Sequence, residues 1–260
     1  GQDLLTRAKQ VDDYISYRHK IQHLPYRVIS LTGSSAHMKV VDPYSNKEKE
    51  MISFVSNDYL GLSHHPEVIK AGIDALEQYG AGAGASPLIG GHNFLHEQLE
   101  QEIAHFLKNE YAITYTSGYA ANCSTLLAMM DKEDIAIMDM FTHASVFDGC
   151  LCTNTKRFLH NNSDSLVHVL NNSKNFKNRF VIIDGVYSQD GDIAFLDQIY
   201  AVCKEHDAFL IVDDAHGIGV LGKTGRGIIE DYGLLDKVDM ITGTFSKAFG
   251  CVGGYAIARK

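Results

Sequence analysis

Short apolar runs recur along the second half of the chain and alternate with longer segments of mixed polarity. Several runs are continuous rather than alternating, which is typical of strands that are buried on both faces of a sheet. Turn residues separate the runs from the segments between them. The pattern therefore predicts seven strands, over Tyr111–Thr116, Asp134–Asp139, Thr155–His160, Arg179–Val186, Ala208–Asp214, Met240–Ser246 and Gly254–Lys260.

Helical periodicity fills most of the segments between these runs, for example over Tyr119–Met130 and Phe195–His206. Strands that alternate with helices are typical of a parallel sheet covered on both faces. Only Lys247–Gly253 separate the last two runs, and a parallel crossover needs about a dozen residues or more. The sequence therefore predicts an α/β fold with a seven-stranded, mostly parallel sheet, in which the last strand of the sequence runs antiparallel.

The first part of the chain has a different organisation. Residues 3–22 are expected to form a charged amphipathic helix, and residues 38–54 a small hairpin. Two further helices are expected over Pro66–Gln78 and His96–Lys108, with a flexible Gly- and Ala-rich segment over Gly80–Pro87 between them. We expect two domains: an N-terminal helix and hairpin at 1–54, and a large α/β domain at 55–260.

Composition narrows the function classes. Of 260 residues, 23 are basic and 32 acidic, which gives a net charge of −9 and disfavours a nucleic-acid-binding surface. The sequence contains no run of about 18 apolar residues, so no membrane-spanning helix is expected. The first ten residues contain no apolar signal-peptide core. The five cysteines are odd in number, which favours reduced thiols in a cytoplasmic protein over a disulfide framework.

Chemistry-bearing residues collect where the predicted strands end, and ligands of open α/β sheets bind at that edge. Ser117 and Gly118 join a strand to a helix, and the free N–H groups of such a turn suit a phosphate. His143 follows the next strand. Asp213 and His216 follow an apolar strand, where a buried carboxylate is costly unless a cationic group pairs with it.

A lysine stands at a fourth strand end. Lys247 lies in a short turn bounded by hydroxyl residues and glycine, where burial favours a neutral amine that can form a Schiff base. Pyridoxal phosphate needs such a lysine, an acid for its pyridine nitrogen and a phosphate seat. The sequence therefore predicts that this cofactor binds at the strand ends.

Two other motifs carry less weight. Gly217–Gly222 has the glycine spacing of a dinucleotide site, but it leads into a loop instead of a helix, which disfavours that interpretation. The acidic residues Asp184, Asp190 and Asp192 lack the full pattern of a calcium loop. We expect no metal site.

Taken together, the motifs resemble the α-oxoamine synthase family of fold-type I pyridoxal-phosphate enzymes. The resemblance covers roughly residues 50–260, in the order found in that family. The matching stretches are Ser56–Leu62, His96 with Leu99 and Glu100, Ser117–Asn122, His143–Ser145, Ser188–Asp192, Asp213–Gly217 and Thr244–Lys247.

The resemblance implies a role for each matched residue. Lys247 would form the Schiff base, Asp213 would pair with the pyridine nitrogen, and His216 would hydrogen-bond the ring hydroxyl. His143 would stack on the ring, and Asn57 would help to hold the carboxylate of an amino acid. The remaining residues expected around the cofactor are Ser117, Gly118, Tyr119, Ser188 and Thr244.

The implied activity is the condensation of an amino acid with an acyl-CoA, with decarboxylation, to give an aminoketone; the family also implies a homodimer. Alternatives are an aminotransferase or lyase of the same fold type, and a non-catalytic subunit that keeps the fold. Three departures from the family stand out: Pro87 replaces a frequent arginine, Asp184 replaces a frequent glutamate, and the family's C-terminal small domain is absent from the sequence, which stops at Lys260.

Overall fold

The computed structural model describes residues 2–23 and 27–259, and it divides into two compact units, Gly1–Ser56 and Asn57–Lys260. The division lies two residues from the domain boundary expected from the sequence. Whether the first segment folds as a domain of its own stays a prediction. Within the described residues, no helix is long and apolar enough to cross a membrane.

The first unit contains the predicted helix and hairpin. Helix α1 (Leu4–Lys20) begins at Asp3, whose side chain accepts a hydrogen bond from the Thr6 amide, and basic residues fill its last turn. Strands β2 (His37–Val41) and β3 (Glu48–Ile52) pair antiparallel as the hairpin. The sequence did not reveal β1 (Ile29–Ser30), a short third strand that pairs with β2.

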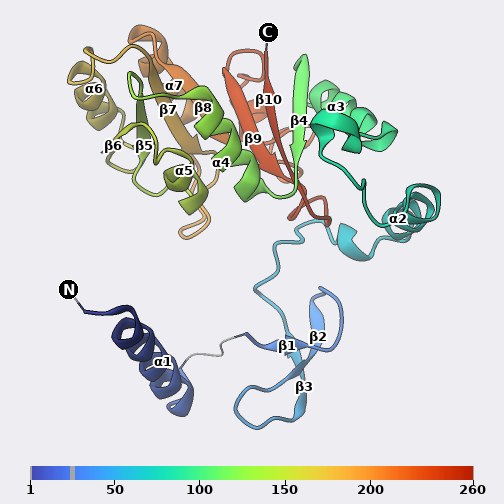
Figure 1. Ribbon diagram of the computed structural model, residues 1–260. Helices are drawn as coiled ribbons and strands as arrows, with labels where there is room; N and C mark the ends of the chain where they lie inside the picture. Colours follow the sequence, from blue (N-terminus) through green and yellow to red (C-terminus); the bar gives the residue numbers. More distant parts are fainter. Residues whose placement is uncertain (1, 24–26, 260) are drawn as a thin grey trace. The chain divides into compact units, whose positions relative to one another are not determined.

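The second unit is built on a seven-stranded sheet that confirms all seven predicted strands (Figure 1). The order β4-β10-β9-β8-β7-β5-β6 places the last strand of the sequence between β9 and β4, antiparallel to both. All the other pairings are parallel. Lys260, the end of the last predicted strand, lies outside the described residues. The strands are β4 (Tyr111–Tyr115), β5 (Ile135–Asp139), β6 (Asn154–Phe158), β7 (Arg179–Asp184), β8 (Phe209–Asp213), β9 (Met240–Thr244) and β10 (Gly254–Ala258).

Helices cover both faces of this sheet, as the continuous apolar strands predicted. Along β5, Ile135 and Ile137 belong to the core shared with α6 and α7, whereas Ala136 and Met138 belong to the core shared with α4 and α5. Successive side chains of a strand point to opposite faces, so a strand buried on both sides must be apolar throughout. Figure 1 shows α4 and α7 on opposite sides of the strands.

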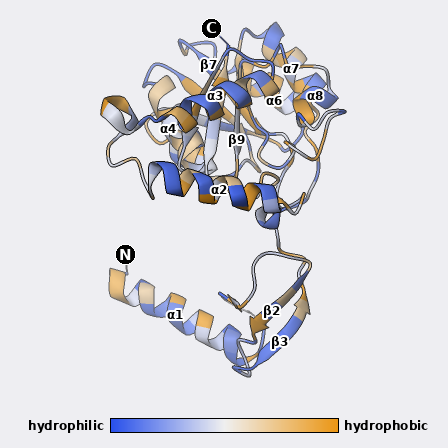
Figure 2. Ribbon diagram, turned by 90° about the vertical axis from the view of Figure 1, so that its right-hand side faces the viewer, coloured by the Kyte–Doolittle hydropathy of each residue, from blue (hydrophilic) through white to orange (hydrophobic). Residues whose placement is uncertain are grey.

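The four helices of the second unit whose bounds were predicted, α2, α3, α4 and α7, begin and end within two residues of those bounds. The expected flexible segment ends at a π-helical turn, η2 (Pro87–Gly91), which the sequence did not predict. Figure 2 shows polar and apolar residues alternating along α2. The helices are η1 (Leu62–His64), α2 (Pro66–Tyr79), α3 (Phe94–Phe106), α4 (Gly118–Met129), α5 (Ala144–Gly149), α6 (Ser163–Asn171), α7 (Leu196–Glu205) and α8 (Ile228–Asp231).

Gly254, the first residue of β10, lies where the backbone of this strand is packed closely against the segment after β4. A Cβ added at Gly254 would lie 2.3 Å from the carbonyl oxygen of Ser117, a contact between backbones that cannot relax without moving a strand. We expect Gly254→Ala to lower the free energy of unfolding by about 2–3 kcal/mol in urea titrations. Gly72→Ala is the matched control, because nothing lies within 4 Å of its added Cβ. Equal stability of the two variants would contradict this packing.

Candidate active site

A pocket opens at the carboxyl ends of the parallel strands, where the sequence placed the candidate chemistry. Its walls come from the ends of β7, β8 and β9, the start of α4 and the segment that precedes η1. Strand ends that are far apart in the sequence therefore meet around one space, as expected for an open α/β sheet. The lining residues are Asn57, Ser117, Gly118, Tyr119, Asn122, His143, Asp184, Asp213, Ala215, His216, Thr244, Ser246 and Lys247.

Lys247 extends into this pocket from the turn between β9 and β10. The turn is closed by a hydrogen bond from the Gly250 amide to the Lys247 carbonyl, and Gly250 has a φ of 66°, which favours glycine. Burial lowers the pKa of the Lys247 ammonium, while the carboxylates of Asp213 and Asp184 oppose that shift. The result is an amine that becomes a neutral nucleophile more readily than a surface lysine does.

Asp213 ends β8 with its carboxylate almost fully buried, at 7% exposure. One oxygen accepts a hydrogen bond from Asn122 Nδ2 at 2.6 Å, and the other accepts one from the Ala215 amide at 3.0 Å. A carboxylate has about four lone-pair positions, so each oxygen has room for another donor. Asp213 is thus oriented by the protein and can still pair with a cationic N–H in the pocket.

A second carboxylate stands beside it. Asp184 is the register partner of Asp213 on the neighbouring strand β7, and it accepts a hydrogen bond from the His143 amide at 3.2 Å. Burial, and then the negative charge of Asp213, raise the pKa of Asp184 well above its usual value. The pair therefore favours one negative charge rather than two, and burial favours the neutral form of Asp184.

The start of α4 offers hydrogen-bond donors. Ser117 caps the helix by accepting from the Ala120 amide at 3.0 Å. The amides of Gly118 and Tyr119 have no partner within the described chain, as expected for the first turn of a helix. A Cβ at Gly118 would lie 2.8 Å from Thr244 Cβ, so only glycine lets the strand end and the helix start approach this closely.

His143 begins α5 and lies beside the aromatic ring of Tyr119. Its Nδ1 lies 2.7 Å from Ser145 Oγ, and it also accepts from the Ser145 amide. The rings of Tyr119 and His143 are 6.3 Å apart in an edge-on arrangement, and the Tyr119 hydroxyl donates to Asp148. These contacts hold an imidazole face and a phenol ring at the mouth of the pocket.

His216 faces Lys247 from the loop after β8, with 2.7 Å between His216 Nε2 and Lys247 Nζ. Burial, and then the positive charge of Lys247, lower the pKa of the His216 imidazole to about 4. The ring is therefore neutral at physiological pH and can donate from one nitrogen while it accepts at the other.

This shift predicts a pH dependence of stability. The unfolded imidazole takes up a proton near pH 6.5 and the folded one only near pH 4, so between these values the unfolded state binds more protons. The stability that the neutral ring contributes is complete above pH 6.5 and is lost as the pH falls towards 4. We therefore expect the free energy of unfolding of the wild type to fall over this window relative to that of His216→Gln. Parallel curves for the two proteins would contradict the shift.

The structure brings together nine of the ten residues expected at the site. Ser188 is the exception: it is exposed in the loop after β7 and does not line the pocket. The sequence analysis assigned no role to Asn122 or Tyr59. Asn122 could have been found as a polar residue on a buried face of an apolar helix, where a hydrogen-bond partner is obligatory. Tyr59 contacts His216 across 157 residues of sequence, which no local pattern reveals.

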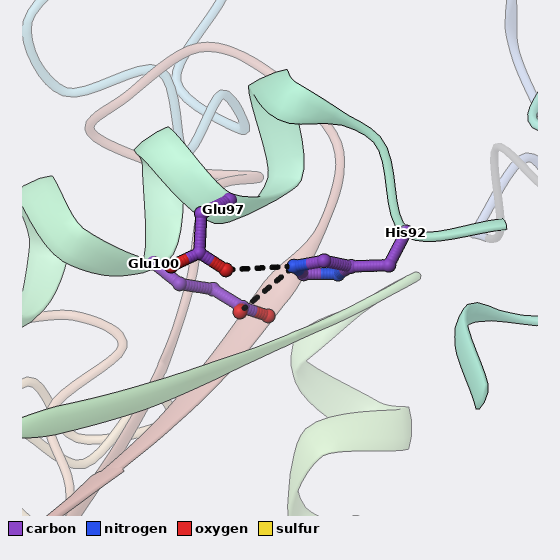
Figure 3. A group of neighbouring side chains, drawn as sticks. All are labelled: His92, Glu97 and Glu100. Carbon is purple, nitrogen blue, oxygen red and sulfur yellow. Dashed lines mark hydrogen bonds and ion pairs between the residues drawn. The ribbon is translucent and has the colours of Figure 1, made fainter. Parts of the chain in front are cut away.

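A separate group of side chains at the start of α3 has the composition of a cation site. Figure 3 shows the ring of His92 pointing at the carboxylates of Glu97 and Glu100. His92 Nε2 lies 3.1 Å from a Glu97 oxygen and 3.7 Å from a Glu100 oxygen, while the other Glu100 oxygen accepts from the Thr114 amide. Hydrogen bonding accounts for this arrangement, because every member already has a partner and the Glu97 side chain is 54% exposed.

The sheet order, the antiparallel β10 and a lysine and an aspartate at neighbouring strand ends define the class of protein: this is the large domain of the fold-type I pyridoxal-phosphate enzymes. The chain belongs to the aminotransferase class I and II family, whose model matches residues 49–260.

Known relatives place the chain within that family. It is 41% identical over 254 residues to 8-amino-7-oxononanoate synthase of Saccharophagus degradans. The aligned region covers 96% of this chain and 63% of that protein. Two solved structures at 33% identity are serine palmitoyltransferase of Sphingomonas wittichii, with a TM-score of 0.90, and that of S. paucimobilis with a bound PLP–myriocin aldimine, with a TM-score of 0.89. They cover 99% and 100% of this chain, which covers 64% and 65% of theirs. These matches confirm the resemblance to the α-oxoamine synthases, and the chain spans less than two thirds of the length of these relatives.

Proposed function

We propose that this chain is the cofactor-binding part of an α-oxoamine synthase, which condenses an amino acid with an acyl-CoA and releases carbon dioxide to form an α-aminoketone. One observation carries the proposal: Lys247, Asp213 and the free amides at the start of α4 line a single pocket. The names of the relatives and the family support the same reaction class.

The pocket fits pyridoxal phosphate at three chemically different points. The amine of Lys247 would bond to the aldehyde carbon. The buried carboxylate of Asp213 has free lone pairs for a protonated ring nitrogen. The amides of Gly118 and Tyr119, with the positive end of the α4 dipole, would bind the phosphate. His143 would cover one face of the ring, and Thr244 would lie on the phosphate side.

The bound cofactor would supply an electron sink for the carbanion formed when the substrate loses its α-proton. The residues of the chain do the rest. Asp213 would keep a proton on the ring nitrogen through its negative charge, and the raised pKa of Asp184 disfavours a second charge beside it. Lys247, with its lowered pKa, can take up the α-proton. Asn57, at the pocket wall, would hold the substrate carboxylate and fix the orientation of the scissile bonds.

The proposal also includes a cytoplasmic homodimer. Helix α2 carries an apolar stripe of Ile69, Ile73 and Leu76, about half exposed and spaced to lie on one face. A stripe of this kind is typical of a surface that another chain covers. The cytoplasmic location rests on the odd number of cysteines and on the family resemblance.

The experiment that tests the reaction class measures free thiol from an acyl-CoA in the presence of cofactor and an amino acid. An α-oxoamine synthase releases thiol and carbon dioxide together. Conversion of the amino acid to its keto acid without thiol release would assign an aminotransferase instead. Cofactor bound to Lys247 with no turnover of any amino acid would identify a non-catalytic subunit.

A further inference from the structure

Four side chains form a continuous line of polar contacts from the reactive amine to the pocket wall. Lys247 Nζ lies 2.7 Å from His216 Nε2, and His216 Nδ1 lies 2.6 Å from the hydroxyl of Tyr59. The same hydroxyl is 3.3 Å from the side-chain oxygen of Asn57. Tyr59 lies in the segment before η1, so it contacts His216 from a part of the chain that belongs to none of the strands.

The hydrogen-bonding capacity of these groups fixes the direction of the line while Lys247 is an ammonium. An ammonium can only donate, so His216 must accept at Nε2 and carry its own proton at Nδ1. That N–H then donates to the Tyr59 oxygen. The Tyr59 hydroxyl has one hydrogen left to give, and the Asn57 oxygen can only accept it.

Removing the ammonium reverses this order. Without a donor at Nε2, the ring is free to carry its proton there and to accept at Nδ1. The Tyr59 hydroxyl is closer to Nδ1, at 2.6 Å, than to the Asn57 oxygen, at 3.3 Å, and an imidazole nitrogen is more basic than an amide oxygen. Tyr59 would therefore turn its hydrogen from Asn57 to His216.

We propose that Tyr59 is a positioning residue that holds His216 against Lys247. Its hydroxyl at Nδ1, together with the charge of Lys247 at Nε2, decides which ring nitrogen of His216 is protonated. The titratable groups that act on the ring are Lys247, Asp213 and His143. The neutral state of His216 supports the proposal, because a protonated ring would donate from both nitrogens and could not accept from Lys247.

The consequence for catalysis rests on the proposed function. If the amine of Lys247 were bonded to a carbonyl carbon, it would no longer be an ammonium, and His216 would be free to carry its proton at Nε2 and present that N–H to the pocket. A donor appears where the cofactor's ring hydroxyl is expected, and the Asn57 oxygen is released from Tyr59. Tyr59 would thus couple the charge of Lys247 to the His216 N–H that faces the cofactor and to the Asn57 oxygen that faces the substrate.

The tautomer of His216 can be measured directly by ¹⁵N NMR of the full chain labelled at histidine, without cofactor, at about pH 6.5 where an unperturbed imidazole is half neutral and this one is neutral. The His216 signals are assigned from their loss in His216→Gln. We expect the Nδ1–H tautomer in the wild type and the Nε2–H tautomer in Lys247→Met. In Tyr59→Phe, the ratio of Nδ1–H to Nε2–H should fall by about tenfold, since the Nδ1 proton loses its acceptor.

Tyr119→Phe is the matched control, because it removes a hydroxyl from the same pocket that donates to Asp148 and not to His216. It should leave the His216 tautomer as in the wild type. The proposal is overturned if Lys247→Met does not reverse the tautomer, or if Tyr59→Phe gives the same ratio as Tyr119→Phe. Circular dichroism confirms that each variant is folded. Since no cofactor is present, failure here would leave the proposed reaction standing, and failure of Lys247 to capture the cofactor would leave the tautomer result standing.

Discussion

Replacing Lys247 by alanine should abolish covalent capture of pyridoxal phosphate by this chain. Borohydride reduction of the loaded wild type should leave the cofactor attached to the peptide that contains Lys247, and mass spectrometry of the variant should show background only. Exchange of the α-proton of a bound amino acid should fall by about 10²–10⁴-fold, because the side chain that takes up this proton is gone.

The control for this variant is Lys237→Ala, which removes an exposed lysine remote from the pocket lining. It should keep the full yield of reduced adduct. A cofactor adduct on another lysine in Lys247→Ala, or an unchanged exchange rate, would refute the assignment of Lys247 as the reactive amine.

The second large effect is expected for Asp213→Asn. The amide has the shape of the carboxylate, and Asn122 can turn its own amide to restore the 2.6 Å hydrogen bond, so the fold should survive. What is lost is the negative charge that holds a proton on the ring nitrogen. We expect α-proton exchange to slow by about 10²–10³-fold, the usual effect of removing one preorganised electrostatic group.

Asp236→Asn, on an exposed turn, serves as the charge-matched control and should exchange at the wild-type rate. Weaker cofactor binding should accompany the slower exchange in Asp213→Asn, as seen in an equilibrium titration of absorbance. If the variant instead exchanged normally, the partner of the ring nitrogen would have to be sought elsewhere, with Asp184 as the nearest alternative.

The sheet could be predicted from the sequence because strands that are buried on both faces appear as continuous apolar runs. Strands such as β5 and β8 are apolar at every position before the aspartate that ends each of them. The short turn around Lys247 forces β10 to reverse direction. The position of β10 between β9 and β4 is not recorded in this way, since it depends on packing between strands far apart in the chain. The π-helical turn at Pro87 was missed for a similar reason: its glycine-rich sequence is compatible with many conformations.

Site residues could be predicted where burying a polar or charged side chain is energetically costly unless it has a partner. A carboxylate such as Asp213 at the end of an apolar strand requires a partner, and a lysine in a glycine-bounded turn has few structural reasons to be there. Ser188 and Tyr59 show the limit of this reasoning. Both are ordinary surface residue types, and only the course of the loops decides that Ser188 is exposed outside the pocket lining while Tyr59 reaches His216.

The position of β10 also bears on how the protein is made. Tyr111 of β4 has Ala258 of β10 as its register partner, so the two halves of one pairing leave the ribosome far apart in time. At about 5–20 residues per second, β4 waits roughly 7–30 s for its neighbour. During that interval β4 has no partner strand in the nascent chain, and the pocket wall formed by Ser117, Gly118 and Thr244 is incomplete. A growing polypeptide would therefore complete its cofactor pocket only after β10 has been synthesised, and until then it would depend on protection of the unpaired strand β4.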